Sequence, residues 1–183
     1  ISTLSAIKIW FDQDIKRLNT DQRGIFLGEF SSDDKILTLY ASGHYRVTNY
    51  DLSNHFDDDL IHIEKFVSDK PLSVFYIDKD SQSLYLKRFI VEPNNKKINI
   101  FEDQEGAELK TFSTDWLPRV EIEGKVYKWR AKGKRVSKNK DAQIHWLEPL
   151  AYEQESETTQ DDEDFDNFSS ELNDKDTIQG SLF

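Results

Sequence analysis

The densest group of residues that could bind a ligand is a run of bases between positions 125 and 140. This run holds eight Lys or Arg residues and no acid in 16 positions, with Tyr127 and Trp129 interleaved. Bases at this density can displace the condensed counterions of a nucleic acid, so one interpretation is a phosphate-binding strip. The alternative is a solvated edge strand that its lysines protect from pairing with other chains. The bases are Lys125, Lys128, Arg130, Lys132, Lys134, Arg135, Lys138 and Lys140.

Further bases stand near expected turns and strand ends, where they could extend such a strip around a perimeter. They include Lys16, Lys96 and Lys97. Our candidate nucleic-acid contacts are eleven bases. Six belong to the run: Lys125, Lys128, Arg130, Lys132, Lys134 and Arg135. The other five are Arg17, Arg23, Arg46, Lys87 and Arg88.

Other residue types that could do chemistry do not form a recognisable constellation. Asp57-Asp58-Asp59 lacks the Gly and the terminal Glu of a calcium loop, so a polar strand connection is the better interpretation. The sequence has no phosphate-binding loop and no Gly-x-Ser-x-Gly element. We therefore predict no catalytic residue and no metal site. The histidines likewise lack metal-ligand spacing and are expected in solvated or turn positions: His44, His55, His62 and His145.

Composition excludes several classes of protein. The chain has no cysteine, which rules out a disulfide scaffold, a thiolate metal site and a cysteine nucleophile, and a reducing cytoplasmic setting fits best. No run approaches the roughly 18 apolar residues of a membrane span, and the N-terminus lacks the layout of a signal peptide. Because the chain opens with Ile1 and contains no Met, we expect the C-terminal piece of a longer protein.

Charge is distributed very unevenly along the chain. Residues 151–183 hold 11 of the 35 acids and one of the 24 bases, a net charge of -10. The preceding 150 residues hold 24 acids and 23 bases and are nearly neutral. A stretch this acidic and poor in aliphatic residues cannot offset its ordering entropy. We predict a domain over residues 1–150 and a disordered tail over residues 151–183.

The elements expected to position these residues are β-strands. In the first 150 residues, apolar side chains alternate with polar ones and are mostly β-branched or aromatic, which is typical of half-buried strands. We therefore predict an all-β fold. The clearest strands are predicted at residues 7–11, 36–40, 45–47, 72–77, 84–91 and 126–129.

Short polar turns are predicted to join strand pairs at residues 41–44, 78–83, 104–106 and 121–125. Three of these turns, centred near Gly43, Ser81 and Gly124, recur about every 40 residues, which is the period of a propeller blade or similar radial repeat. A sandwich or barrel of hairpins also accounts for the pattern.

Several segments together resemble the C-terminal domain of the A subunit of bacterial type IIA topoisomerases, and more narrowly that of topoisomerase IV. The resemblance covers roughly residues 4–147 and is strongest in the first 90. The segments are Ile7-Lys8-Ile9-Trp10, the stretch from Arg17 to Phe30, Asp34-Lys35-Ile36-Leu37, Tyr45-Arg46-Val47-Thr48, and a return strand from Leu60 to Phe66 that is followed by Leu72 to Phe75.

This resemblance implies a β-pinwheel, here of about three or more blades, whose basic rim binds and bends duplex DNA. It implies a fragment that is itself no enzyme but serves an ATP-dependent topoisomerase in the cytoplasm, at the nucleoid. The cleavage tyrosine and the Mg²⁺ and ATP sites would belong to the upstream core of the same polypeptide or to the ATPase B subunit. No cofactor is expected in this fragment, and no membrane contact.

One departure from the family separates its branches. Gyrases carry a Gln-Arg-Arg-Gly-Gly-Lys-Gly box in the first blade for chiral DNA wrapping. This chain has Gln22-Arg23-Gly24-Ile25-Phe26-Leu27-Gly28 at that place, without the second Arg and the Lys. The loss of two phosphate contacts favours the topoisomerase IV branch over gyrase.

The last residues resemble the peptide by which bacterial proteins dock on the replicative sliding clamp. Gln179, Leu182 and Phe183 would make the contacts, with the tail as a tether, and Gly180 departs from the usual Leu. The alternative is an apolar terminus without function. This resemblance supports a second hypothesis, a protein-interaction module whose tail recruits the clamp or other chromosome proteins.

Overall fold

The structure of the protein is a computed structural model that describes residues 5–128 and 134–151, with only the backbone of Lys128. Every regular element within these ranges is a β-strand, and the strands form four antiparallel sheets. The all-β prediction is therefore confirmed. Several separate antiparallel sheets are also consistent with the β-pinwheel that the resemblance implies.

The chain divides into two compact units. Within the described residues, the first unit comprises residues 5–68 and 92–102, and the second comprises residues 69–91, 103–128 and 134–151. The predicted boundary between a domain of residues 1–150 and a tail stays a prediction, because nearly all of the tail lies outside the described residues.

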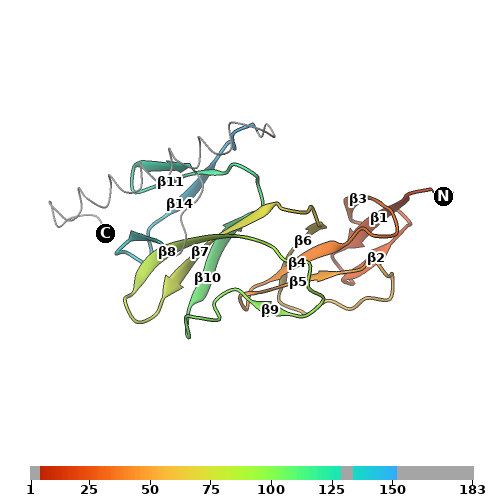
Figure 1. Cartoon of the computed structure of the whole chain (residues 1–183), viewed down its shortest axis with the longest axis horizontal. Helices are drawn as coiled ribbons and strands as arrows, with labels where there is room; N and C mark the ends of the chain where they lie inside the picture. Colours follow the sequence, from red (N-terminus) through yellow and green to blue (C-terminus); the bar gives the residue numbers. More distant parts are fainter. Residues whose placement is uncertain (1–4, 129–133, 152–183) are drawn as a thin grey trace. The chain divides into compact units, whose positions relative to one another are not determined.

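The first unit contains two sheets (Figure 1). One has the strand order β2-β1-β3, and the other has the order β6-β4-β5-β9. The strands are β1 (Ile7–Asp12), β2 (Arg17–Asn19), β3 (Ile25–Phe30), β4 (Ile36–Tyr40), β5 (His44–Thr48), β6 (Leu60–Lys65) and β9 (Ile98–Asn99).

The core of the first unit follows from side-chain alternation. Ile9 and Phe11 on β1 are buried and pack with Ile36 and Ile63 of the other sheet. Successive residues of a strand point to opposite faces, so the residues between these anchors remain more exposed. Burial of each such side chain contributes about 1.5–3 kcal/mol. Phe56, which follows β5 in the chain, adds an edge-to-face contact with Phe11 at 5.5 Å between ring centroids.

The second unit also contains two sheets. One has the order β10-β7-β8-β13 and the other has the order β12-β11-β14. Figure 1 labels β7 and β8, the two central strands of the four-stranded sheet. The strands are β7 (Pro71–Asp78), β8 (Ser83–Ile90), β10 (Glu108–Ser113), β11 (Arg119–Ile122), β12 (Lys125–Lys128), β13 (Lys134–Ser137) and β14 (Ile144–Leu147).

The two sheets of the second unit share one core cluster. Phe75, Leu84 and Leu86 come from one sheet, and Val120 and Ile122 come from the other. Trp146 on β14 packs against this cluster and donates a hydrogen bond from Nε1 to Thr111 Oγ1 on β10 at 3.1 Å. The indole therefore adds a polar link between the two sheets to their apolar contact.

Three of the four predicted turns join strand pairs as expected. Residues 41–44, 78–83 and 121–125 link β4 to β5, β7 to β8 and β11 to β12, each in a different sheet. Gly43 and Gly124 adopt φ values of 86° and 77°, where a side chain would be strained. The spacing of about 40 residues thus reflects one hairpin in each of three sheets.

The hairpin predicted at residues 104–106 is wrong. The strand before this turn, β9, pairs with β5, whereas the strand after it, β10, pairs with β7. The turn therefore carries the chain from one sheet to another. A two-residue strand such as β9 has no alternation of its own, so its partner cannot be inferred from local sequence.

Candidate nucleic-acid interface

The basic run at residues 125–140 lies on the edges of both sheets of the second unit. It begins on β12, an edge strand of one sheet, and continues on β13, an edge strand of the other. Residues 129–133, which include Arg130 and Lys132, lie outside the described part of the chain. The run is therefore a connection from one sheet edge to the next.

Two apolar side chains hold these edge strands in place. Tyr127 on β12 and Val136 on β13 are buried, and both belong to the core cluster shared by the two sheets. The sequence folds this way because one apolar side chain in each short strand can enter the core, while its basic neighbours keep access to water. The run is thus anchored at two points.

The described bases of the run differ in exposure and in partners. Lys125 and Lys134 are half-buried, whereas Arg135 and Lys138 are exposed. Lys140 pairs with the carboxylate of Asp141 at 3.0 Å. Among the described bases of the run, Arg135 and Lys138 are therefore the most exposed to solvent.

The turn after β13 is built by its own polar side chains. Ser137 Oγ accepts a hydrogen bond from the Asn139 backbone N–H at 2.9 Å, and Asn139 Oδ1 accepts one from the Asp141 N–H at 3.0 Å. Such side-chain caps satisfy backbone donors that the turn would otherwise leave without partners. Lys138 therefore sits in a defined turn.

Lys110 on β10 secures the same turn from outside. Its Nζ donates to the carbonyl oxygens of Lys140 and Ala142 at 2.9 and 2.7 Å. Partial burial lowers the pKa of the Lys110 ammonium from its usual value. Two carbonyl acceptors favour the charged form in return, so we assign Lys110 a structural position behind the basic turn.

On β8, the two predicted contacts lie on opposite faces of the strand. Arg88 Nη2 donates to the Trp116 carbonyl at 2.8 Å, and the Lys87 amine lies over the Phe89 ring, 5.7 Å from its centroid. Lys87 shares its face with Tyr85, which stands opposite Arg135 of β13. The pairing therefore brings Lys87 and Arg135 to one face of the sheet.

The remaining candidate contacts belong to the first unit. Arg17 begins β2 opposite Asp12, and Arg46 on β5 donates from Nε to the Asn95 carbonyl at 2.8 Å. Arg23 lies in the loop before β3, and its guanidinium pairs with Asp21 at 3.3 Å. A carbonyl thus engages Arg46 and a carboxylate engages Arg23.

A buried amide fixes the loop that carries Arg23. Asn19 Oδ1 accepts from the backbone N–H groups of Asp21 and Arg23, and its Nδ2 donates to the Arg23 carbonyl, at 2.9 to 3.1 Å. Gly24 follows with a φ of 89°, and a Cβ there would meet the Phe11 carbonyl oxygen at 2.0 Å. The loop therefore requires glycine at this position.

A family model described as the topoisomerase C-terminal domain of Bacteroidota matches residues 17–144, from the start of β2 to the start of β14. The chain belongs to this family. The resemblance to the C-terminal domain of a bacterial topoisomerase is confirmed at that level. Comparison with curated protein sequences and with solved structures gives no match.

Sequence reasoning missed one base of this topoisomerase C-terminal domain that stands beside the run. Arg119 on β11 lies directly opposite Lys128 of β12, and its Nε donates to the Glu148 carbonyl at 2.8 Å. The sequence around it, Arg119-Val120-Glu121, has no basic density. Its place in the interface depends on strand pairing, which the local sequence does not specify.

Net charge differs between the two units of the topoisomerase domain. Residues 1–68 and 92–102 hold nine bases and 13 acids, whereas residues 69–91 and 103–150 hold 14 bases and 11 acids. The near-neutral body thus combines an acidic unit with a basic one. A polyanion is attracted to the second unit more than to the first.

Among the residues that the structure describes, no group of three or more His, Cys, Asp or Glu could hold a metal ion. Asp57 instead pairs with Lys97 at 2.7 Å, and Asp58 pairs with Lys16 at 3.6 Å. Asp59 accepts a hydrogen bond from the Ser42 backbone N–H at 3.1 Å. No helix within residues 5–128 and 134–151 could cross a membrane. Gln179, Leu182 and Phe183 lie outside the described residues.

Proposed function

We propose that this topoisomerase C-terminal domain binds duplex DNA along the basic run of its second unit. The observation that carries the proposal is the placement of the run on β12 and β13, which are edge strands of two sheets with a common core. Placed this way, the bases can follow a phosphate backbone across both edges. The alternative, that lysines only protect these edge strands from pairing with other chains, predicts no binding of DNA.

The role we propose is to position and bend a DNA segment for strand passage by an ATP-dependent type IIA enzyme of the topoisomerase IV kind. In this proposal the domain forms the C-terminal part of the enzyme's A subunit, with a role at the nucleoid in chromosome segregation. DNA cleavage, Mg²⁺ and ATP would be handled by the upstream core and the B subunit. Gly24 and Leu27 stand where the gyrase box carries its second Arg and its Lys, and the loss of these two charges supports a contact without chiral wrapping.

Salt dependence of DNA binding tests this proposal. The full chain is titrated with a fluorescent duplex at two salt concentrations. Because each phosphate contact releases counterions, the logarithm of the association constant should fall with the logarithm of the salt concentration by about 0.9 per contact. Binding that is absent, or that does not respond to salt, contradicts the proposal.

A second candidate function rests on the terminal Gln179-Gly180-Ser181-Leu182-Phe183 segment. We propose that this peptide docks on the replicative sliding clamp, with Leu182 and Phe183 in an apolar pocket. Removal of residues 179–183 should abolish capture of the chain by purified clamp, whereas removal of residues 153–157 should leave it unchanged. Equal capture of both deletion variants excludes clamp docking.

A further inference from the structure

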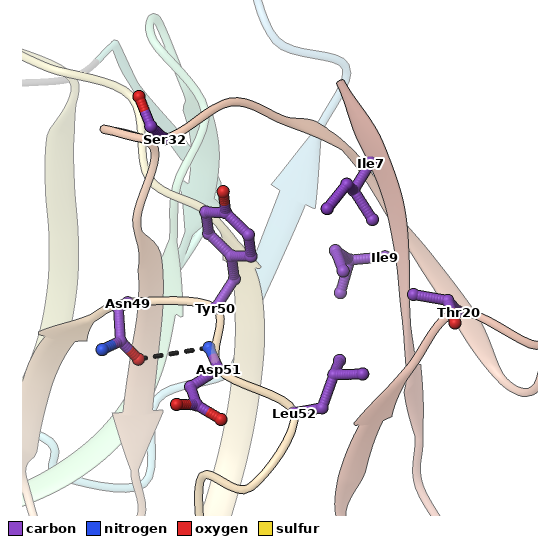
Figure 2. Close-up of a pocket in the computed structure, with 8 residues that line it drawn as sticks. All are labelled: Ile7, Ile9, Thr20, Ser32, Asn49, Tyr50, Asp51 and Leu52. Carbon is purple, nitrogen blue, oxygen red and sulfur yellow. Dashed lines mark hydrogen bonds between the residues drawn. The ribbon is translucent and has the colours of Figure 1, made fainter. Parts of the chain in front are cut away.

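An open groove of about 350 Å³ lies in the first unit, between β1 and the loop that follows β5. Figure 2 shows Ile7, Ile9 and Leu52 along one side of this groove and Tyr50 across from them. Ile9 is 1% exposed, whereas Ile7 and Leu52 are 46% and 44% exposed. The groove therefore has a buried apolar floor and two apolar walls that contact solvent.

The loop that forms one wall is held in a fixed shape. Asn49 Oδ1 accepts from the Asp51 N–H at 3.2 Å, and Asp51 Oδ1 accepts from the Ser53 N–H and hydroxyl at 2.9 and 2.7 Å. Asn54 Nδ2 closes the loop on the Asn49 carbonyl at 2.9 Å. The exposure of Leu52 is therefore imposed by the loop, at the cost of about 25 cal/mol for each Å² of apolar surface left in water.

One ring contact fixes Tyr50, which belongs to the same loop as Leu52 and lies across the groove from it. The Tyr50 ring packs against Phe30 of β3, with 5.2 Å between the ring centroids. Both walls are thus formed before any ligand arrives, so a ligand would not have to order them.

The charge around the groove selects among possible occupants. Its lining includes Asp51 and, among the described residues, no base. Hydrogen bonds from Ser53 lower the pKa of the Asp51 carboxyl, so it stays ionised at neutral pH. The unit as a whole holds four more acids than bases. DNA and the acidic tail of this chain, both polyanions, are therefore repelled from the groove.

We propose that the groove is a docking site for a segment of another protein that carries one large aliphatic side chain flanked by Lys or Arg. The aliphatic group would cover Ile7, Ile9 and Leu52, and a flanking base would face Asp51. This inference goes beyond the proposed DNA binding and does not depend on it. The two units would then bind partners of opposite charge.

Backbone amide NMR shifts of the full, ¹⁵N-labelled chain test the proposal with three probe peptides. The probes are acetyl-Gly-Lys-Leu-Lys-Gly-amide and its counterparts with Ala for Leu or with Glu for both Lys residues. Only the first peptide should shift the amides of Ile7, Thr20 and Leu52, and the shifts should diminish as salt is added. Absence of these shifts, or equal shifts with either counterpart, overturns the proposal.

Matched variants separate the apolar and the charged contributions. Leu52→Ser should weaken binding of the first peptide by about threefold or more, whereas Ile61→Ser on β6, a residue that is also 44% exposed, should not. Asp51→Asn keeps an oxygen for the Ser53 hydrogen bonds and should remove the preference for Lys over Glu. Equal weakening by Leu52→Ser and Ile61→Ser contradicts a site in the groove.

Discussion

At the scale of single residues, the bases of the domain divide into those that present charge and those that fix structure. Arg135 and Lys138 are exposed, while Lys110 and Arg88 donate to backbone carbonyls. Sequence alone does not separate these two kinds of base, because charge density does not reveal what a side chain contacts. The distinction yields predictions for individual substitutions.

Lys110→Met should weaken DNA binding several-fold although Lys110 lies outside the run. The reason is that two hydrogen bonds to the turn that carries Lys138 are lost. Fluorescence anisotropy measures the effect, and Lys79→Met, which removes the same charge from the same unit, serves as the control. If Lys110 acts through Lys138, then Lys138→Ala should have less effect in the Lys110→Met background. Fully additive effects contradict this positioning role.

Asp34 should contribute to stability at neutral pH but not in acid. Its carboxylate accepts from the Ser31 N–H at 2.7 Å and pairs with Lys65 at 3.4 Å. The hydrogen bond from Ser31 lowers the pKa of Asp34, so its contribution is present above the pKa of the unfolded chain and is lost as pH falls through the folded pKa.

Asp34→Asn should therefore lower the free energy of unfolding by up to about 1 kcal/mol at neutral pH, because the pair is partly solvated. The difference from the wild-type chain should shrink towards zero as the solution is acidified below the folded pKa. Urea unfolding at several pH values measures this, with Asp33→Asn, an exposed neighbour, as the control. A difference that does not depend on pH contradicts the assignment.

At the scale of elements, the pairing of β8 with β13 decides which predicted contacts can act together. Arg135 stands opposite Tyr85 and shares a face with Lys87, whereas Arg88 lies on the other face and is bonded to the Trp116 carbonyl. One strand therefore carries two adjacent bases with different roles.

Arg135→Ala should weaken DNA binding and reduce the salt slope by about 0.9, the value for one phosphate contact, with little loss of stability. Arg88→Ala should instead lower the free energy of unfolding by about 1–3 kcal/mol, because a charged hydrogen bond to a carbonyl is lost. Duplex titration and urea unfolding of both variants distinguish the two roles. A smaller salt slope of DNA binding for Arg88→Ala, together with an unchanged slope for Arg135→Ala, would contradict these two roles.

Much of the fold could be predicted from local sequence. Strands such as β4, β7 and β8 are runs of five to eight residues rich in aliphatic and aromatic side chains, and their hairpin turns carry Gly or Asp and Ser. The sheet to which a strand belongs could not be predicted in the same way. β9 returns to β5 about 50 residues earlier, and β10 and β13 flank a hairpin formed by β7 and β8, so these pairings depend on distant residues.

The candidate interface was predictable in composition but not in geometry. The run at residues 125–140 stands out by charge alone, yet its division between two sheets and its register opposite Arg119 follow from long-range pairing. Lys110 was missed because its contacts are made 30 and 32 residues away in sequence. The groove beside Leu52 was missed because a single exposed Leu in a polar loop gives no periodic signal.

At the scale of the whole molecule, charge is divided among three parts: a first unit with more acids than bases, a second unit with more bases than acids over residues 69–91 and 103–150, and an acidic tail. A tail with a net charge of -10 can compete with DNA for the same positive surface. The charge distribution therefore predicts that the tail inhibits DNA binding.

Removal of residues 151–183 should raise DNA affinity, and most strongly at low salt, where screening is weakest. Titration of the full and the shortened chain with one duplex over a range of salt concentrations measures the effect. When a separate peptide of residues 151–183 is added to the shortened chain, the affinity for DNA should fall again. Equal affinities of the full and shortened chains at low salt contradict inhibition by the tail.

The most direct measurement of the central claim compares the salt slopes of two matched double variants. One replaces the exposed Arg135 and Lys138 of the basic run by Gln, and the other replaces the exposed Lys8 and Lys35 of the first unit by Gln. If the run contacts DNA, the first variant should lose about 0.9 of slope per contact, about 1.8 in total, while the second keeps the wild-type slope. Equal slopes for the two variants would contradict DNA binding through the basic run.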